Sequence, residues 1–273
     1  MVPGVLPLKG VGIIRQSYAP WHNRIAALVS RERETRFSGG ALGHIWAYLI
    51  PLTWIAFVVA LFRLTGRTPP INVGAEIFVA TGILPYIMFR QTVTSMTRGV
   101  ISNRHLLHVR PVGISDLLTA SVVSELMNTL VSMLLVFGLV TLVFDAPLPT
   151  NPGRVLTGAL GAWMLGVGLG RLVAVLGLMS DTFARSVPIL LRPAFWLSGI
   201  FFTAAELPGS LQQILWWSPL LHVSELVREG YFLGYRSTIA DAGMVTISAL
   251  IPYALSFPVE AFLVRNRMSR YRI

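Results

Sequence analysis

The sequence contains no cysteine and a single lysine, Lys9, among its 273 residues. The lack of cysteine excludes disulfides, thiolate zinc sites and cysteine nucleophiles together. Lys9 lies in the context LPLKG, and no stretch of the form G-x-x-x-x-G-K-S/T occurs, so the chain has no phosphate-binding P-loop. The sequence also lacks a G-x-S-x-G elbow, an H-E-x-x-H pair and a cluster of carboxylates. ATP hydrolysis by a P-loop within this chain is therefore excluded.

Charge is also scarce, because charged residues make up 12% of the chain and hydrophobic residues 54%, with a mean hydropathy of +0.67. Soluble domains contain about a quarter charged residues, so this composition indicates a membrane protein. The first residues, MVPGVLPLKG, contain Pro3, Gly4 and Pro7 and lack a basic region ahead of an apolar one. They make a poor signal peptide, and we expect the first membrane helix to target the chain.

The net charge of +10 has a distribution that argues against nucleic-acid binding. Basic residues lie in short segments beside apolar runs, as orientation signals do, and form no continuous basic face. We expect no nucleic-acid partner.

Apolar runs predict an all-α integral membrane protein with one transmembrane domain over residues 1–273. The clearest run, 41–62, has 22 residues without formal charge, or ~33 Å as a helix, which matches the hydrocarbon core of a bilayer. Six spans are expected, at 42–64, 75–98, 115–144, 154–179, 187–204 and 240–263. Ser115 is a candidate cap of the third span, with Asp116 in its first turn.

Two segments outside the spans have mixed character. In residues 21–38, Trp21, Ile25, Leu28 and Val29 share one face, as in an amphipathic helix at the membrane interface. A solvated helix that packs on a partner explains the same pattern equally well. Residues 205–235 contain prolines, glutamines and adjacent tryptophans, which favour a re-entrant pair of short helices over a seventh span.

Orientation follows from the positive-inside rule. With six spans and both termini in the cytoplasm, fourteen basic residues lie inside and five outside. A seventh span would place the four C-terminal arginines outside, against the rule. We therefore expect a multi-pass membrane protein with both ends cytoplasmic.

Three arginines lie within the predicted spans, at Arg90, Arg171 and Arg192, with Glu76 and Glu125 as candidate counter-ions. A charge at membrane depth usually faces a partner or a wet cavity. Snorkelling or a structural ion pair explains such arginines as well, whereas the functional interpretation is an anionic substrate held by guanidinium forks. Aromatic rings stack on sugars, and Trp196, Phe201 and Phe202 are the candidates in the proline-containing fifth span.

The fourth span carries small residues at four-residue spacing: Gly158, Ala162, Gly166, Gly170 and Ala174. Such a ladder lets two membrane helices approach closely, and we interpret it as structural.

Several stretches together resemble the permeases of ABC-type capsular polysaccharide exporters. Arg31-Glu32, Arg36-Phe37, Leu42-Gly43, Trp46 and Pro51-Leu52 resemble their RE…RF…LGxxW…PL signature, and HLLHVRPV looks like their loop between spans two and three. The strongest likeness is VPILLRPAFWLSGIFF followed by LPGSLQQILWWSPLLHVSELVREGYFLGY, which resembles their fifth span and a W-N-P-L-x-H-x-x-E-L-x-R-E run. Ser218 stands where that run has Asn. The likeness covers about residues 28–235.

This resemblance implies a homodimer joined to two copies of a separate ATPase subunit, which would bind the ATP and Mg²⁺; no cofactor or metal is expected on this chain. The expected substrate is lipid-linked acidic polysaccharide, moved from cytoplasm to periplasm with the help of a periplasmic co-polymerase and an outer-membrane protein. The expected substrate-binding residues are Arg90, Arg171, Arg192, Trp196, Phe201 and Phe202, with His44, Trp46 and Tyr48 near the cytoplasmic mouth. The expected ATPase contacts are Arg31, Arg33, Arg36, Phe37, Asn103, Arg104, His105, Leu106, Leu107, His108 and Arg110.

Other functions remain open at this stage. A related permease for O-antigen or a teichoic-acid-type polymer would share the same features. A membrane glycosyltransferase or phosphotransferase would need an acidic metal-binding loop, whereas the cytoplasmic connections hold only the isolated Asp116 and Asp181. A non-transporting membrane anchor would have no use for charges within its spans.

Overall fold

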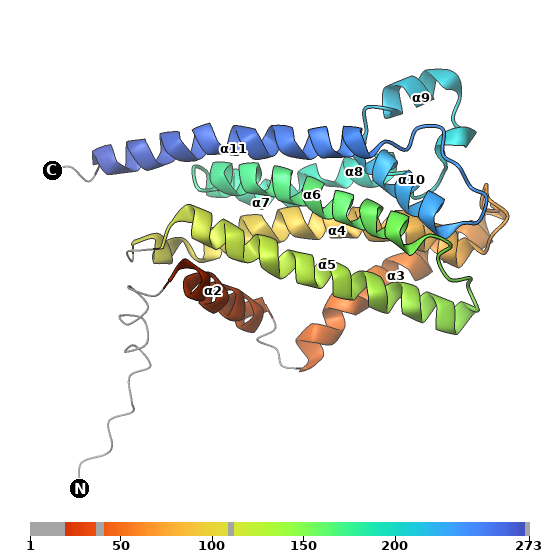
Figure 1. Cartoon of the computed structure of the whole chain (residues 1–273), viewed down its shortest axis with the longest axis horizontal. Coiled ribbons are helices and arrows are strands. Elements are labelled where there is room, and N and C mark those ends of the chain that lie inside the picture. Colours follow the sequence, from red (N-terminus) through yellow and green to blue (C-terminus); the bar gives the residue numbers. More distant parts are fainter. Residues whose placement is uncertain (1–19, 37–40, 109–111, 271–273) are drawn as a thin grey trace, which may run out of the picture.

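The computed structural model describes residues 20–36, 41–108 and 112–270, and of these it describes 33–36, 41–48, 50, 108 and 267–270 by their backbone alone. Within these ranges all regular secondary structure is helical, which confirms the predicted class (Figure 1). The elements in chain order are α2 (Trp21–Arg36), α3 (Ala41–Leu64), α4 (Ala75–Ser102), η2 (Arg104–His108), α5 (Ile114–Phe144), α6 (Pro152–Gly177), α7 (Asp181–Leu190), α8 (Arg192–Leu197), η3 (Ala204–Glu206), α9 (Gly209–Leu215), α10 (Pro219–Tyr231) and α11 (Ala242–Arg270).

Four of these helices are long and apolar enough to cross a bilayer: α4, α5, α6 and the Ala242–Asn266 part of α11. The part of α3 that is described with side chains adds a shorter apolar helix, Pro51–Leu64. The count of six spans stays a prediction.

The long helices form a bundle with α4 and α6 at its centre (Figure 1). In the most apolar window of α4, 89% of the residues are buried, against 22% in α5 and 17% in α11. The outward faces of α5 and α11 are apolar, as lipid-facing helices require. We call the end of the bundle that holds η2 and the first turns of α5 and α7 the η2 end, and the opposite end, where α10 lies, the α10 end.

Small residues on α6 allow this close packing, as the four-residue ladder predicts. A Cβ on Gly158 would lie 2.5 Å from a Val227 methyl on α10, and one on Gly166 would lie 2.6 Å from the Thr92 Cβ on α4. A second row faces α11, where a Cβ on Gly168 would lie 2.1 Å from the Ala249 carbonyl oxygen. The ladder is therefore structural.

The expected fifth span, 187–204, is not one continuous helix. Its helical part begins earlier, at Asp181, breaks after Leu190 and ends at Leu197. Pro193 has no N–H to donate to the Ile189 carbonyl, which explains the break. Gly199, with a φ of +76°, takes the left-handed conformation that ends helices. At 1.5 Å per residue, α7 and α8 together reach about 25 Å, short of the hydrocarbon core.

Residues 205–235 form short helices, as expected, and a buried arginine ties them to the end of α8. Arg228 on α10 is fully buried and donates to the carbonyl oxygens of Gly199 (2.6 Å) and Phe202 (2.8 Å) and to Glu225 (3.2 Å). The Tyr235 hydroxyl donates to the same carboxylate at 2.6 Å. Burial, followed by the Glu225 charge, raises the pKa of Tyr235, so the phenol stays protonated and remains a donor.

Helix α2 lies along the first half of α5 (Figure 1). Its predicted apolar face meets this chain itself, because Ile25 is buried and Leu28 packs on the cluster around Leu117 and Leu118. The Trp21 indole N–H donates to Asp116 at 3.2 Å. Asp116 also accepts the Gly113 N–H (3.1 Å), so it caps α5 in place of the expected Ser115.

Candidate functional site

One predicted substrate residue, Arg90, lies in a cavity between α3, α4 and the α7–α8 break. This inner cavity has a volume of about 360 Å³ and is lined by Trp54, Tyr86, Arg90, Thr94, Arg98 and Phe195, among others. The Nε atom of Arg90 is buried and has no hydrogen-bond partner in the part of the chain that the structure describes. A buried donor without a partner destabilises the fold, so the position of Arg90 beside the cavity is not explained by its contacts within the chain.

Aromatic rings form one wall of the inner cavity. The Phe195 ring lies 5.2 Å from that of Tyr86 and 5.3 Å from that of Trp54, centroid to centroid. Phe195 also contacts Phe201, which stacks on Trp196 at 5.2 Å with an interplanar angle of 20°. A guanidinium beside aromatic faces suits a sugar that carries negative charge.

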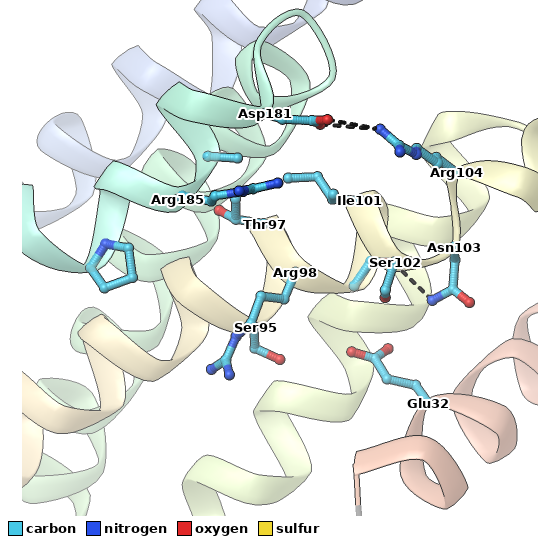
Figure 2. A pocket seen from close by; sticks show the side chains of 13 residues that line it. Glu32, Ser95, Thr97, Arg98, Ile101, Ser102, Asn103, Arg104, Asp181 and Arg185 are labelled. Carbon is cyan, nitrogen blue, oxygen red and sulfur yellow. Dashed lines mark hydrogen bonds and ion pairs between the residues drawn. The ribbon is translucent and has the colours of Figure 1, made fainter.

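A larger outer cavity of about 880 Å³ opens at the η2 end (Figure 2). Arg98 and Pro188 line both cavities, so the two are adjacent along α4. Figure 2 shows Arg98 and Arg185 on the cavity wall and Arg104 paired with Asp181 at 3.1 and 3.3 Å. Glu32 reaches the cavity from α2 and accepts a hydrogen bond from the Ser121 hydroxyl (3.1 Å).

Arg171 lies outside both cavities. Its Nε donates to Ser256 (2.7 Å) and its terminal nitrogen pairs with Glu260 (2.5 Å), while its guanidinium carbon lies 4.3 Å from the centre of the Phe257 ring. Neither expected counter-ion is its partner, and Glu76 instead pairs with Arg63. The contacts of Arg171 make it a buried link between α6 and α11, in line with the structural alternative.

Arg192 and Trp196 are exposed on α8, and neither lines a cavity within this one chain. Phe201 and Phe202 are half-buried beside them. The side chains of His44, Trp46 and Tyr48 lie outside the described part of α3. The structure thus places Arg90 in one cavity with Trp54, Tyr86 and Phe195, which were not predicted as site residues. Of the predicted aromatic residues, Trp196 and Phe201 contact this wall through Phe195.

The expected ATPase contacts gather at the η2 end. His105 is exposed and its Nε2 lies 3.2 Å from a terminal nitrogen of Arg31, so that α2 and η2 touch. Asn103 donates to the Gly99 carbonyl (2.8 Å), and Leu106 and Leu107 pack half-buried against the core. Phe37 and Arg110 lie outside the described residues, as do the side chains of Arg33, Arg36 and His108.

Residues 23–232 match the ABC-2 type transporter family. The chain belongs to this family. This ABC-2 type transporter is 30% identical to the polysialic acid transport protein KpsM of Escherichia coli. The alignment of 229 residues covers 83% of this chain and 88% of KpsM. It is 27% identical over 242 residues to the capsule polysaccharide export inner-membrane protein BexB of Haemophilus influenzae (86% and 89%). It is 26% identical over 224 residues to CtrC of Neisseria meningitidis serogroup B, also a capsule polysaccharide export inner-membrane protein (80% of this chain and 82% of CtrC).

These similarities confirm the resemblance on which the sequence interpretation rests, and the matched region contains every helix from α3 to α10. The sequence did not predict the cavity arginines Arg98 and Arg185 or the aromatic residues Trp54, Tyr86 and Phe195 as site residues. A signal was present, because Tyr86, Arg90, Thr94, Arg98 and Ser102 follow one another at intervals of four residues and all line a cavity. This polar stripe winds along α4, from the inner cavity to the outer one.

Proposed function

We propose that this chain is the membrane subunit of an ATP-driven exporter of lipid-linked acidic capsular polysaccharide. Two copies would join two copies of a separate ATPase subunit, and the polymer would pass from cytoplasm to periplasm. A periplasmic co-polymerase and an outer-membrane protein would carry it onward. The η2 end would then face the cytoplasm, in agreement with the count of basic residues.

The observation that carries the proposal is the polar stripe of α4 beside an aromatic wall, in a chain similar over more than four-fifths of its length to polysaccharide transporters. Polysialic acid, named for the relative from Escherichia coli, is a polymer of acidic sugars. Arg90 supplies a cation for such charges, and Trp54, Tyr86 and Phe195 supply faces for sugar rings.

The second copy would meet the exposed apolar surface of α7 and α8. Ile189, Leu190 and Trp196 are each about 60% exposed there, next to Arg192. A dimer across this surface would place Arg192 and Trp196 between the two chains, and His44, Trp46 and Tyr48 near the cytoplasmic mouth. The substrate path would then run between the copies, with the inner cavity on its wall.

The ATPase would bind the η2 end. There η2 contacts α2 through Arg31 and His105 and contacts α7 through Arg104 and Asp181. A movement of η2 would therefore reach both the N-terminal helix and the broken fifth segment.

Two alternatives find less support. An O-antigen export permease of Myxococcus xanthus, RfbA, is 30% identical but matches only 47% of this chain, against 80–86% for the three capsule-related relatives named above. A metal-dependent transferase would need free carboxylates, whereas Asp116 caps α5 and Asp181 is paired with Arg104.

Co-purification and export assays test the proposal. The chain should purify with an ATPase subunit in equal copy number, and deletion of the chain should leave the polymer inside the cell. Restoring the wild-type chain should return polysaccharide to the surface. A chain that purifies without an ATPase, or a deletion strain with a normal surface polymer, would overturn the exporter.

A further inference from the structure

Two cations that line the outer cavity, Arg98 and Arg185, form no ion pair with its acidic residues in the described structure. Asp181 is paired with Arg104, and Glu32 accepts a hydrogen bond from Ser121. Within the described residues, Arg185 forms no hydrogen bond or ion pair, and Arg98 uses only its Nε, to the Thr94 carbonyl at 3.3 Å. The terminal nitrogens of Arg98 and the whole guanidinium of Arg185 are therefore available to a ligand.

These two guanidiniums come from different helices and line the same cavity. Arg98 lies on α4 and Arg185 on α7, and Figure 2 shows both beside the hollow that Glu32, Ser102 and Asn103 also line. Each guanidinium presents a planar fork of N–H donors, which fits the oxygens of a phosphate or a carboxylate in a bidentate way. Each of the two guanidiniums can therefore bind an anion that enters this cavity.

The depth of the cavity indicates which anion. Arg98 lies four residues, or about 6 Å, along α4 from Ser102, where that helix ends before η2, and Arg90 lies about 12 Å further on. The polar layer of a bilayer is roughly 5–7 Å thick on each side. With η2 at the membrane surface, Arg98 and Arg185 lie at the level where lipid phosphates meet the hydrocarbon, and Arg90 lies within the hydrocarbon.

We propose that the outer cavity is an entrance site for a lipid-anchored phosphate ester, bound by Arg98 and Arg185. This inference rests on the proposed function, because a lipid-linked polymer must present its phosphate at this depth to enter. The inner cavity, adjacent through Arg98 and Pro188, would then take the first sugars between Arg90 and the aromatic wall. The Arg104–Asp181 pair forms the outer rim of the site.

Binding of alkyl probes to the full-length chain tests the site. The chain is purified in a maltoside detergent, which has no phosphate, with its ATPase partner and without ATP. Fluorescently labelled dodecyl phosphate is the probe, and unlabelled dodecyl phosphate, dodecyl glucuronide and inorganic phosphate are the competitors. Arg98→Gln and Arg185→Gln should each weaken binding of the probe about tenfold, because each removes charge-assisted hydrogen bonds to the phosphate.

Two further variants separate binding from folding. Arg236→Gln, an exposed arginine at the α10 end, should leave the affinity unchanged. Arg98→Lys keeps the charge but loses the fork, and should bind with intermediate affinity. All variants should keep the wild-type unfolding temperature, because neither Arg98 nor Arg185 holds a carboxylate in the described structure.

Each competitor has a decisive outcome. Displacement by dodecyl phosphate, with weak displacement by inorganic phosphate, supports a lipid-anchored phosphate. Equal displacement by inorganic phosphate would overturn the lipid part of the proposal, and preferential displacement by the glucuronide would make the cavity a carboxylate site instead. Probe affinity unchanged in both Gln variants would overturn the site. The binding assay does not depend on transport. If binding requires the arginines but the export assay shows that the chain exports nothing, the proposed exporter is refuted and the phosphate site is retained.

Discussion

Two groups of arginines, in two regions of the molecule, differ in what they contact. On the side of α6, α10 and α11, Arg171 and Arg228 are buried and hold carboxylates and carbonyls of the same chain. On the side of α4 and α7, Arg90, Arg98 and Arg185 face cavities without a carboxylate partner in the described structure. A charge within a membrane usually faces a partner or a wet cavity, and these three arginines face cavities that a ligand could enter.

The first prediction concerns Arg228, the more deeply buried of the two arginines that are paired within the chain. Arg228→Met removes the donors to Gly199 and Phe202 and leaves the Glu225 carboxylate buried without its cation. Breaking a buried pair costs about 3–5 kcal/mol, so we expect a large fall in the unfolding temperature in detergent and poor assembly with the ATPase.

The control is the double variant Arg228→Met with Glu225→Gln, which removes the orphaned charge and should recover part of that loss. Full stability of the single variant would contradict the assignment of Arg228 as an internal anchor.

The second prediction concerns the close packing of α6 on α11, the two helices that the Arg171–Glu260 pair joins. A side chain at Gly168 would meet the Ala249 backbone 2.1 Å away, so Gly168→Val should push α6 from α11 and destabilise the fold by about 1–3 kcal/mol. It should also strain the Arg171–Glu260 pair. The matched control is Gly138→Val on α5, where nothing lies within 4 Å of the added Cβ. Equal unfolding temperatures for the two variants would contradict the close approach.

The third prediction tests the unpaired side. Arg90→Gln should reduce export of the polymer about tenfold or more, because the inner cavity loses its cation, while the unfolding temperature and the amount of complex stay unchanged. Surface polysaccharide and purified complex are measured together, with Arg236→Gln as the control. Normal export by Arg90→Gln would remove Arg90 from the substrate path, and a loss of complex would place it among the structural arginines.

The contrast between the two regions could be predicted from the sequence only in part. Apolar runs gave the helical class and located α4, α5, α6 and α11, because a bilayer requires long uncharged helices. Arg90 and Arg171 looked alike as cations within spans. What separates them is Glu260, 89 residues from Arg171, and no local pattern indicates so distant a partner.

The fifth segment shows a different limit. Its prolines were visible, and Pro193 accounts for the break after Leu190, but the left-handed Gly199 accepts a bond from Arg228 on α10, which no local pattern indicates. Arg98, by contrast, was accessible, because it continues the four-residue spacing of Tyr86, Arg90 and Thr94. Arg98 falls at the boundary of the expected second span, so it does not belong to the three arginines within spans.

The last and smallest effect is expected at the Arg104–Asp181 pair, which forms the outer rim of the cavity at the η2 end. The Arg104–Asp181 pair is about half exposed on both sides, and exposed pairs contribute at most about 1 kcal/mol. Arg104→Ala should therefore leave the unfolding temperature nearly unchanged. If the pair carries the movement of η2 to α7, the same variant should lower the ATP hydrolysis that substrate stimulates by a few-fold and spare the basal rate. The exchanged pair, Arg104→Asp with Asp181→Arg, should restore stimulation, because it keeps the attraction and reverses only its direction. Stimulation that is unchanged in Arg104→Ala would assign the pair to the surface alone, and stimulation that the exchange does not restore would mean that Arg104 acts through the ATPase and not through α7.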